Sequence, residues 1–111
     1  MDTTTTLAEL ITLVADFIAA RQWEPYHTSK NLAMSIAIEA AELMEHFQWV
    51  DKAEGQQSLQ DPEIKAEVGD ELADILIYAI SFALQANLDI SEIVREKMAR
   101  NEVRFPPAQR E

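Results

Sequence analysis

The chain has 111 residues, 48% of them hydrophobic, with two glycines, no cysteine and a formal net charge of −11 at pH 7. This length suits one domain, the scarcity of glycine favours helices, and the missing cysteine excludes a disulfide framework and a zinc–thiolate site. The negative charge argues against binding to nucleic-acid polymers or anionic membranes. Because the first residues lack the features of a signal peptide, we expect one cytoplasmic domain over residues 1–111, with flexible ends at 1–5 and 107–111.

The first part of the chain repeats apolar residues at helical spacing, which predicts an amphipathic helix over about residues 6–22. A short polar and aromatic connection, residues 23–29, follows and holds Trp23, Tyr26 and His27. Two interpretations of these rings are open. Trp23 and Tyr26 could seal the edge of the core while His27 lies in solvent, or the rings could form a wall on which an aromatic base stacks.

A second helix is predicted over about residues 29–50, with Thr28 or Ser29 as its N-cap. One of its faces is apolar. Another face carries polar and aromatic residues at positions i, i+3, i+7 and i+10, namely Glu39, Glu42, His46 and Trp49. We expect the first face to pack and the second to carry the chemistry. Residues 51–60 are polar and are predicted to form a loop.

Asp61 and Pro62 begin a third helix well, as N-cap and first helical residue, and Asn87 is a suitable stop. Its residues 72–84 are apolar on nearly every face, which predicts a helix packed inside a bundle. This run is too short to span a bilayer and contains Asp74. The loop before the helix returns the chain antiparallel, so that its acidic face meets the acidic face of the second helix.

A fourth helix is predicted over about residues 89–103, where the basic residues concentrate. Lys97, Asn101 and Arg104 share one side of it, at i, i+4 and i+7. Such a side suits phosphate oxygens. The alternative is that these side chains only form solvent-exposed ion pairs with neighbouring glutamates.

The central feature is a pair of acidic half-sites, Glu39-Ala-Ala-Glu42 and Glu71-Leu-Ala-Asp74. Residues three apart share a helical face, so two packed helices would direct four carboxylates to one point. Asp74 is the only charge in an apolar run and needs a base, a proton or a metal as its partner. Carboxylates without cysteine suit Mg²⁺ or Mn²⁺. A di-iron site is disfavoured because no helix carries Glu-x-x-His.

These residues resemble the all-α nucleotide pyrophosphohydrolases of the MazG superfamily. The two half-sites look like the acidic motif of that family. The surrounding stretches are similar to its dCTP pyrophosphatase-type branch, notably Trp23-Glu-x-x-His27, Lys30-Asn31-Leu32, Asp74-Ile-Leu-Ile-Tyr78 and Lys97-Met98 followed by Asn101. The likeness covers about residues 7–106 and implies a four-helix bundle with antiparallel central helices, assembled as a dimer or a dimer of dimers.

The resemblance also implies an activity, the hydrolysis of (deoxy)nucleoside triphosphates to the monophosphate and pyrophosphate in control of the nucleotide pool. The catalytic residues implied for this activity are Glu39, Glu42, Glu71 and Asp74. They would bind Mg²⁺, for which Mn²⁺ could substitute. Glu39 or Glu42 would also orient the attacking water. Phosphate oxygens would be held by Lys30, Lys97, Asn101 and Arg104, and the base and sugar by Trp23, His27, Asn31, Trp49 and Tyr78.

One position departs from the family pattern. Cytosine-preferring members are expected to carry a histidine near Val14, and valine cannot form a hydrogen bond with a base. The preferred base, dCTP or another deoxynucleotide, is therefore left open. The alternative to an enzyme is a non-catalytic acidic helical module that binds a protein partner through its first helix and exposed aromatic side chains.

Overall fold

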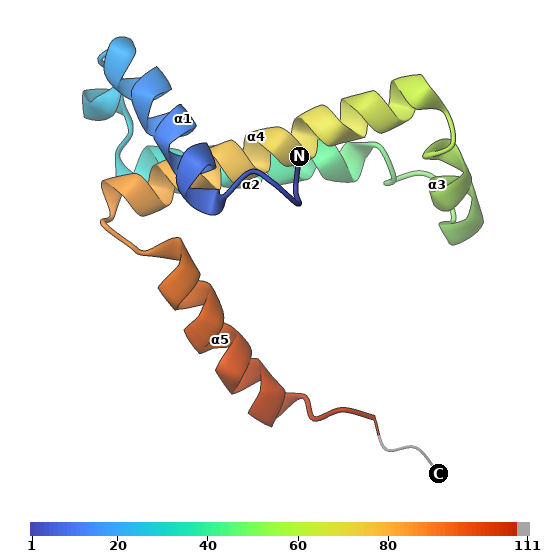
Figure 1. Ribbon diagram of the computed structural model, residues 1–111. Helices are drawn as coiled ribbons and strands as arrows, with labels where there is room; N and C mark the ends of the chain where they lie inside the picture. Colours follow the sequence, from blue (N-terminus) through green and yellow to red (C-terminus); the bar gives the residue numbers. More distant parts are fainter. Residues whose placement is uncertain (109–111) are drawn as a thin grey trace.

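The computed structural model describes residues 1–108, which form helices and no strand (Figure 1). The elements in chain order are α1 (Leu7–Ala20), the 3₁₀ turn η1 (Glu24–Tyr26), α2 (Ser29–Glu45), α3 (Lys52–Ser58), α4 (Pro62–Gln85) and α5 (Ile90–Arg104). The expected all-α class is confirmed, and all four predicted helices are present. Residues 109–111 of the expected flexible end lie outside the described part of the chain.

The helices begin where the sequence predicts, because a side-chain oxygen accepts a backbone N–H in the first turn of each. Thr6 and Glu9 form a reciprocal capping box at the start of α1. The caps of the other long helices are Thr28, Asp61 and Asp89. These local hydrogen bonds explain why the starts of the helices could be predicted from the sequence alone.

The middle of the chain differs from the prediction in two ways. First, α2 ends at Glu45 instead of about Val50, so that Trp49 lies beyond the helix. Second, the expected loop at residues 51–60 contains α3, whose N-cap Asp51 accepts a hydrogen bond from the backbone of Glu54 at 2.8 Å. The helical turn also places Gly55 against the ring of Phe47. The N-cap and this contact stabilise α3, although its polar sequence does not predict a helix.

The antiparallel pair of α2 and α4 is the centre of the fold, and α1 crosses the C-terminal half of α4 (Figure 1). The core lies at that crossing. It is formed by Val14 and Ile18 of α1 and Ile80 of α4, with Ile11 and Ile90 packed against them. This arrangement fixes the position of α1 and of the connection that follows it relative to α4.

The prediction that α4 is packed on all sides is wrong for the single chain. Leu72, Leu76 and Ile77 are 49%, 56% and 44% exposed, and Asp74 is exposed as well. The reason is the course of α5, which leaves α4 at a bend of 105° and points away from the α2–α4 pair (Figure 1). Asn87, with a φ of 55°, forms the turn that starts this bend.

The apolar character of α4 does not make it a membrane span. Within the described residues no single helix is both long and apolar enough to cross a bilayer. Only α4 and α5 taken together meet that criterion, across the 105° bend.

Candidate metal centre and adjoining cavity

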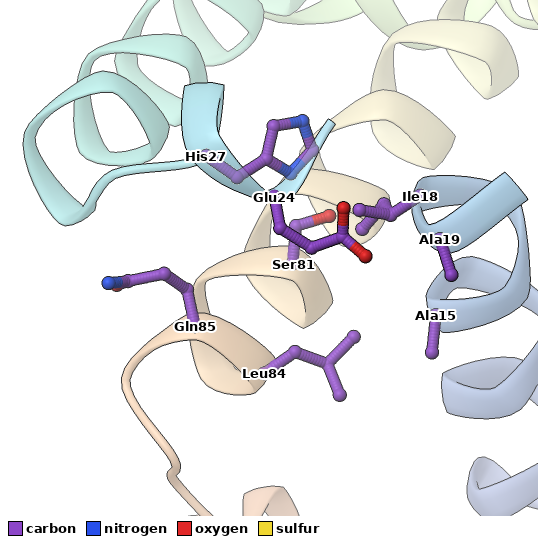
Figure 2. A pocket seen from close by; sticks show the side chains of 8 residues that line it. All are labelled: Ala15, Ile18, Ala19, Glu24, His27, Ser81, Leu84 and Gln85. Carbon is purple, nitrogen blue, oxygen red and sulfur yellow. The ribbon is translucent and has the colours of Figure 1, made fainter. Parts of the chain in front are cut away.

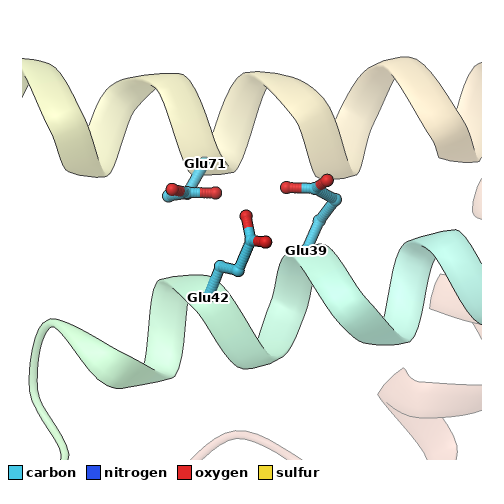
Figure 3. A group of neighbouring side chains, drawn as sticks. All are labelled: Glu39, Glu42 and Glu71. Carbon is cyan, nitrogen blue, oxygen red and sulfur yellow. The ribbon is translucent and has the colours of Figure 1, made fainter.

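Three carboxylates converge between the two central helices. Glu39 and Glu42 lie one turn apart on α2, and the antiparallel course of α4 places Glu71 opposite them (Figure 3). One ligand oxygen from each residue lies within 4.8 Å of those of the other two. All three side chains are half-buried. We call this group the acidic cluster.

The electrostatics of the acidic cluster are unfavourable without a cation. Burial, followed by the neighbouring Glu42 carboxyl, raises the pKa of Glu39 to about 7. Burial likewise raises the pKa of Glu71, again with a contribution from Glu42. One carboxylate oxygen of Glu39 and one of Glu71 are buried without a hydrogen-bond partner. Unpaired buried carboxylate oxygens are the donors that a hard divalent cation accepts, so these residues fit Mg²⁺ or Mn²⁺.

Asp74, the fourth predicted ligand, is not part of this convergence. It is exposed and lines the neighbouring cavity. Asp74 follows Glu71 by three residues on α4, so the two share a helical face, and its negative charge raises the pKa values of Glu39 and Glu71. The structure therefore brings three of the four predicted carboxylates together and places the fourth at the border between the cluster and the cavity.

A cavity of about 490 Å³ adjoins the acidic cluster between α1, the connection and α4. Three of the residues predicted to bind the base and sugar, Trp23, His27 and Tyr78, line it together with Asp74. Trp23 thus lines a cavity and does more than seal the core. Tyr26, in contrast, is 71% exposed and is not among the lining residues of this cavity.

Apart from Val14, whose position was expected to lie near the base, the rest of the cavity wall was not predicted from the sequence. Its apolar part is formed mainly by Leu13, Val14, Phe17 and Ile77, and Ser81 adds one hydroxyl group. Phe17 is one of the apolar residues at helical spacing in the predicted first helix, but it is 47% exposed. The only sequence signal for its role is its spacing from Arg21 and Trp23, which brings all three to the same end of α1.

A second cavity, of about 320 Å³, shares Ile18, His27 and Ser81 with the first (Figure 2). Glu24 and Gln85 add polar groups to its wall. The Nδ1 atom of His27 is buried and has no hydrogen-bond partner. His27 therefore stands between the two cavities with an unused hydrogen-bonding group.

Lys30 and Asn31 lie in the first turn of α2 and are exposed. The Asn31 amide donates a hydrogen bond to the backbone carbonyl of Tyr26 at 3.1 Å. Neither residue is among those that line the large cavity. The contact of Asn31 holds the connection in place, which supports the cavity wall indirectly.

Four predicted substrate residues lie away from the cavity in the single chain. Lys97, Asn101 and Arg104 are on α5, which points away from the central pair (Figure 1). Trp49 is 87% exposed and follows the C-terminal end of α2. The 17 residues of α2 span roughly 25 Å, so Trp49 and Trp23 are at opposite ends of this helix. None of the four is among the residues lining the large cavity.

Comparison with known proteins agrees with this architecture. Residues 34–110 match the model of the MazG-like family. The chain is 37% identical over 101 residues to dCTP pyrophosphatase 1 of Rattus norvegicus and 37% identical over 103 residues to dCTP pyrophosphatase 1 of Homo sapiens. A crystal structure of a pyrophosphatase from Archaeoglobus fulgidus superposes with a TM-score of 0.84 at 41% identity.

The extent of these matches differs between the relatives. The alignments with both mammalian proteins cover 91% of this chain but only 59% of theirs. The archaeal structure is matched over 91% of this chain and 93% of its own. The family model covers more than half of the chain and includes both acidic half-sites. The chain belongs to the MazG-like family.

Proposed function

We propose that this protein hydrolyses (deoxy)nucleoside triphosphates to the monophosphate and pyrophosphate in a reaction that requires Mg²⁺. The observation that carries this proposal is the acidic cluster of Glu39, Glu42 and Glu71 beside a cavity with aromatic walls. The names of the relatives, dCTP pyrophosphatase and pyrophosphatase, support the same reaction class. A deoxynucleotide such as dCTP is the proposed substrate, and control of the nucleotide pool in the cytoplasm is the proposed role.

The residues divide the work between charge and proton transfer. Mg²⁺, or Mn²⁺ in its place, supplies neutralisation of the triphosphate charge and a lower pKa for a nearby water when it is bound. Glu39, Glu42 and Glu71 would hold the cation, with Asp74 at the border of the cavity as a further ligand. Glu39 or Glu42 would also orient the attacking water, and the carboxylate that does so would accept its proton.

The attack is proposed to occur at the α-phosphorus. The water oxygen forms a bond to that atom, the bond from the α-phosphorus to the bridging oxygen breaks, and pyrophosphate leaves. Positioning and charge stabilisation do most of the work in phosphoryl transfer. Trp23, His27 and Tyr78 line the cavity in which the base and sugar would lie.

We further propose that the protein acts as a homodimer or homotetramer. Leu76 on α4 and Met98 on α5 are 56% and 52% exposed, and further large apolar side chains on both helices are exposed beside them. Monomeric proteins rarely leave extended apolar surface in water. In such an assembly Trp49, together with Lys30, Lys97, Asn101 and Arg104, would complete the substrate site from a second copy or after rearrangement of α5.

The assembly is tested by measuring molar mass with light scattering. The single chain has a mass of 12.6 kDa, and we expect two or four times this value. Leu76→Arg should lower the measured molar mass, because burying an unpaired charge in an apolar interface makes the free energy of association less favourable. The matched control is Ala66→Arg, also on an exposed position of α4. A monomeric wild-type protein would contradict the proposal.

The reaction is tested by incubating the protein with Mg²⁺ and a panel of ribo- and deoxyribonucleoside triphosphates and separating the products by chromatography. We expect monophosphate and pyrophosphate in equal amounts, and the fastest substrate identifies the preferred base and sugar. Diphosphate and phosphate would instead reject attack at the α-phosphorus. Turnover of no triphosphate, with Mn²⁺ also tried, would favour a non-catalytic module that binds a protein partner.

A further inference from the structure

Four side chains at the end of α1 and in the following connection form a row, which we call the aromatic row. The guanidinium of Arg21 lies 3.6 Å from the ring centroid of Phe17. The Phe17 ring meets the indole of Trp23 edge to face, with centroids 5.5 Å apart and an interplanar angle of 76°. The ring of His27 follows at 6.2 Å from that of Trp23. Phe17, Trp23 and His27 line the large cavity, whereas Arg21 is outside it.

Arg21 is attached to Phe17 by two contacts. Its guanidinium covers the Phe17 ring, and its Nη1 atom donates a hydrogen bond to the Phe17 backbone carbonyl at 3.2 Å. A planar guanidinium stacks well on an aromatic face and gains from the negative charge of that face. A solvated arginine would need neither contact, so the geometry indicates that Arg21 holds the Phe17 ring in one orientation.

The backbone of Trp23 is fixed by the end of α1. Gln22 has a φ of 55°, and the N–H groups of Gln22 and Trp23 donate to the carbonyls of Ala19 and Ile18 at 3.1 and 3.2 Å. This is a Schellman ending with a residue other than glycine in the left-handed conformation. Such a conformation is unfavourable and persists where the surrounding contacts impose it. The turn therefore sets the position of Trp23, and Phe17 sets the direction of its indole.

The arrangement leaves part of the indole available to a ligand. An edge-to-face contact with Phe17 engages at most one of the two faces of the Trp23 ring, and Trp23 is 42% exposed. Within the described part of the chain no lysine or arginine lines the cavity, and Asp74 is the only acidic residue in its wall. A cavity of this kind suits the uncharged, planar base of a nucleotide and does not suit its phosphates.

We propose that Arg21 and Phe17 are positioning residues for the substrate base. Arg21 holds the Phe17 ring, and Phe17 holds the Trp23 indole in the orientation in which the indole stacks on the base. Arg21 and the acidic cluster are not in contact. The aromatic row therefore acts on binding of the base and not on hydrolysis itself. The inference rests on the proposed function, because it requires a nucleotide in the large cavity.

The test separates substrate binding from turnover. Arg21→Met, which keeps an unbranched side chain but removes the guanidinium and its charge, should raise KM roughly three- to tenfold and leave kcat within about twofold. Phe17→Leu should raise KM by at least as much, because it removes the ring itself. Arg21→Lys retains a cation and a donor but loses the planar stack, so its KM should lie between those of the wild type and Arg21→Met.

The matched control is Lys65→Met, which removes the same charge from an exposed position of α4. It should leave both constants unchanged. A direct readout of the row uses the Trp49→Phe background, in which Trp23 is the only tryptophan. Time-resolved fluorescence anisotropy of Trp23 should show a larger fast local motion after Arg21→Met than after Lys65→Met.

The outcomes differ in what they overturn. A more mobile indole with unchanged KM would reduce the row to a structural role and reject the proposal. An indole unaffected by Arg21→Met, or a KM for Arg21→Lys no lower than that for Arg21→Met, would also reject it. A wild-type protein that neither binds nor hydrolyses any triphosphate would overturn the proposed function together with this inference. This outcome is distinguishable from the others because the wild-type protein, and not only a variant, is inactive.

Discussion

Glu71→Gln is expected to lower the Mg²⁺-dependent hydrolysis of nucleoside triphosphates by more than roughly a hundredfold. Loss of a residue that only hydrogen-bonds to a metal ligand commonly lowers metal affinity or activity ten- to a hundredfold, and loss of a ligand itself should lower activity more. Glu71 contributes an oxygen to the acidic cluster from the helix opposite Glu39 and Glu42. Glutamine keeps the shape of the side chain but has no charge with which to hold a divalent cation. Initial rates at saturating nucleotide, with pyrophosphate as the measured product, provide the readout.

The same substitution should not unfold the protein. The three carboxylates of the acidic cluster repel one another, and one oxygen of Glu71 is buried without a partner. Replacing one charge by an amide relieves that repulsion, so Tm in EDTA should equal or exceed the wild-type value. The rise in Tm that Mg²⁺ produces in the wild type through linkage should be lost.

Glu67→Gln is the matched control for this prediction. Glu67 lies one turn before Glu71 on α4 and is exposed. The substitution is chemically identical and should change neither hydrolysis nor the response to Mg²⁺. Survival of full activity in Glu71→Gln would show that the metal site is wrong as drawn.

Metal-free protein is expected to lose stability as the pH rises from about 4.5 to about 7, on account of Glu39. In the folded state the pKa of Glu39 is raised to about 7, whereas the ordinary pKa of a glutamate, expected in the unfolded chain, is 4.5. Within this window the folded chain keeps a proton that the unfolded chain has released. The folded state therefore binds more protons, and the free energy of unfolding decreases with rising pH until Glu39 is ionised in both states.

The measurement is Tm as a function of pH in EDTA, compared between the wild type and Glu39→Gln. The variant cannot ionise at this position, so the difference in Tm between the two proteins should grow with pH across the window. Saturating Mg²⁺ should weaken the loss of stability in the wild type, because metal binding favours the deprotonated carboxylates. A difference in Tm that does not vary with pH would contradict the raised pKa of Glu39.

Local features of the sequence determined much of the fold. The caps Thr6, Thr28, Asp61 and Asp89 begin the long helices as predicted, because a cap needs only the residues of its own first turn. The pairing of Glu39 with Glu42 on one helical face also follows from the sequence, since the periodicity of a helix fixes which residues share a side.

Only the tertiary structure decided how these elements meet. Glu71 converges with Glu39 and Glu42 while Asp74 faces the cavity, because the alignment of α2 against α4 depends on side-chain packing along their whole length. The bend at Asn87 exposes the apolar side of α4, which the sequence pattern had indicated as buried. The role of Phe17 in the cavity wall likewise arises from a contact across a turn, because spacing along a helix specifies a face but not what that face will meet.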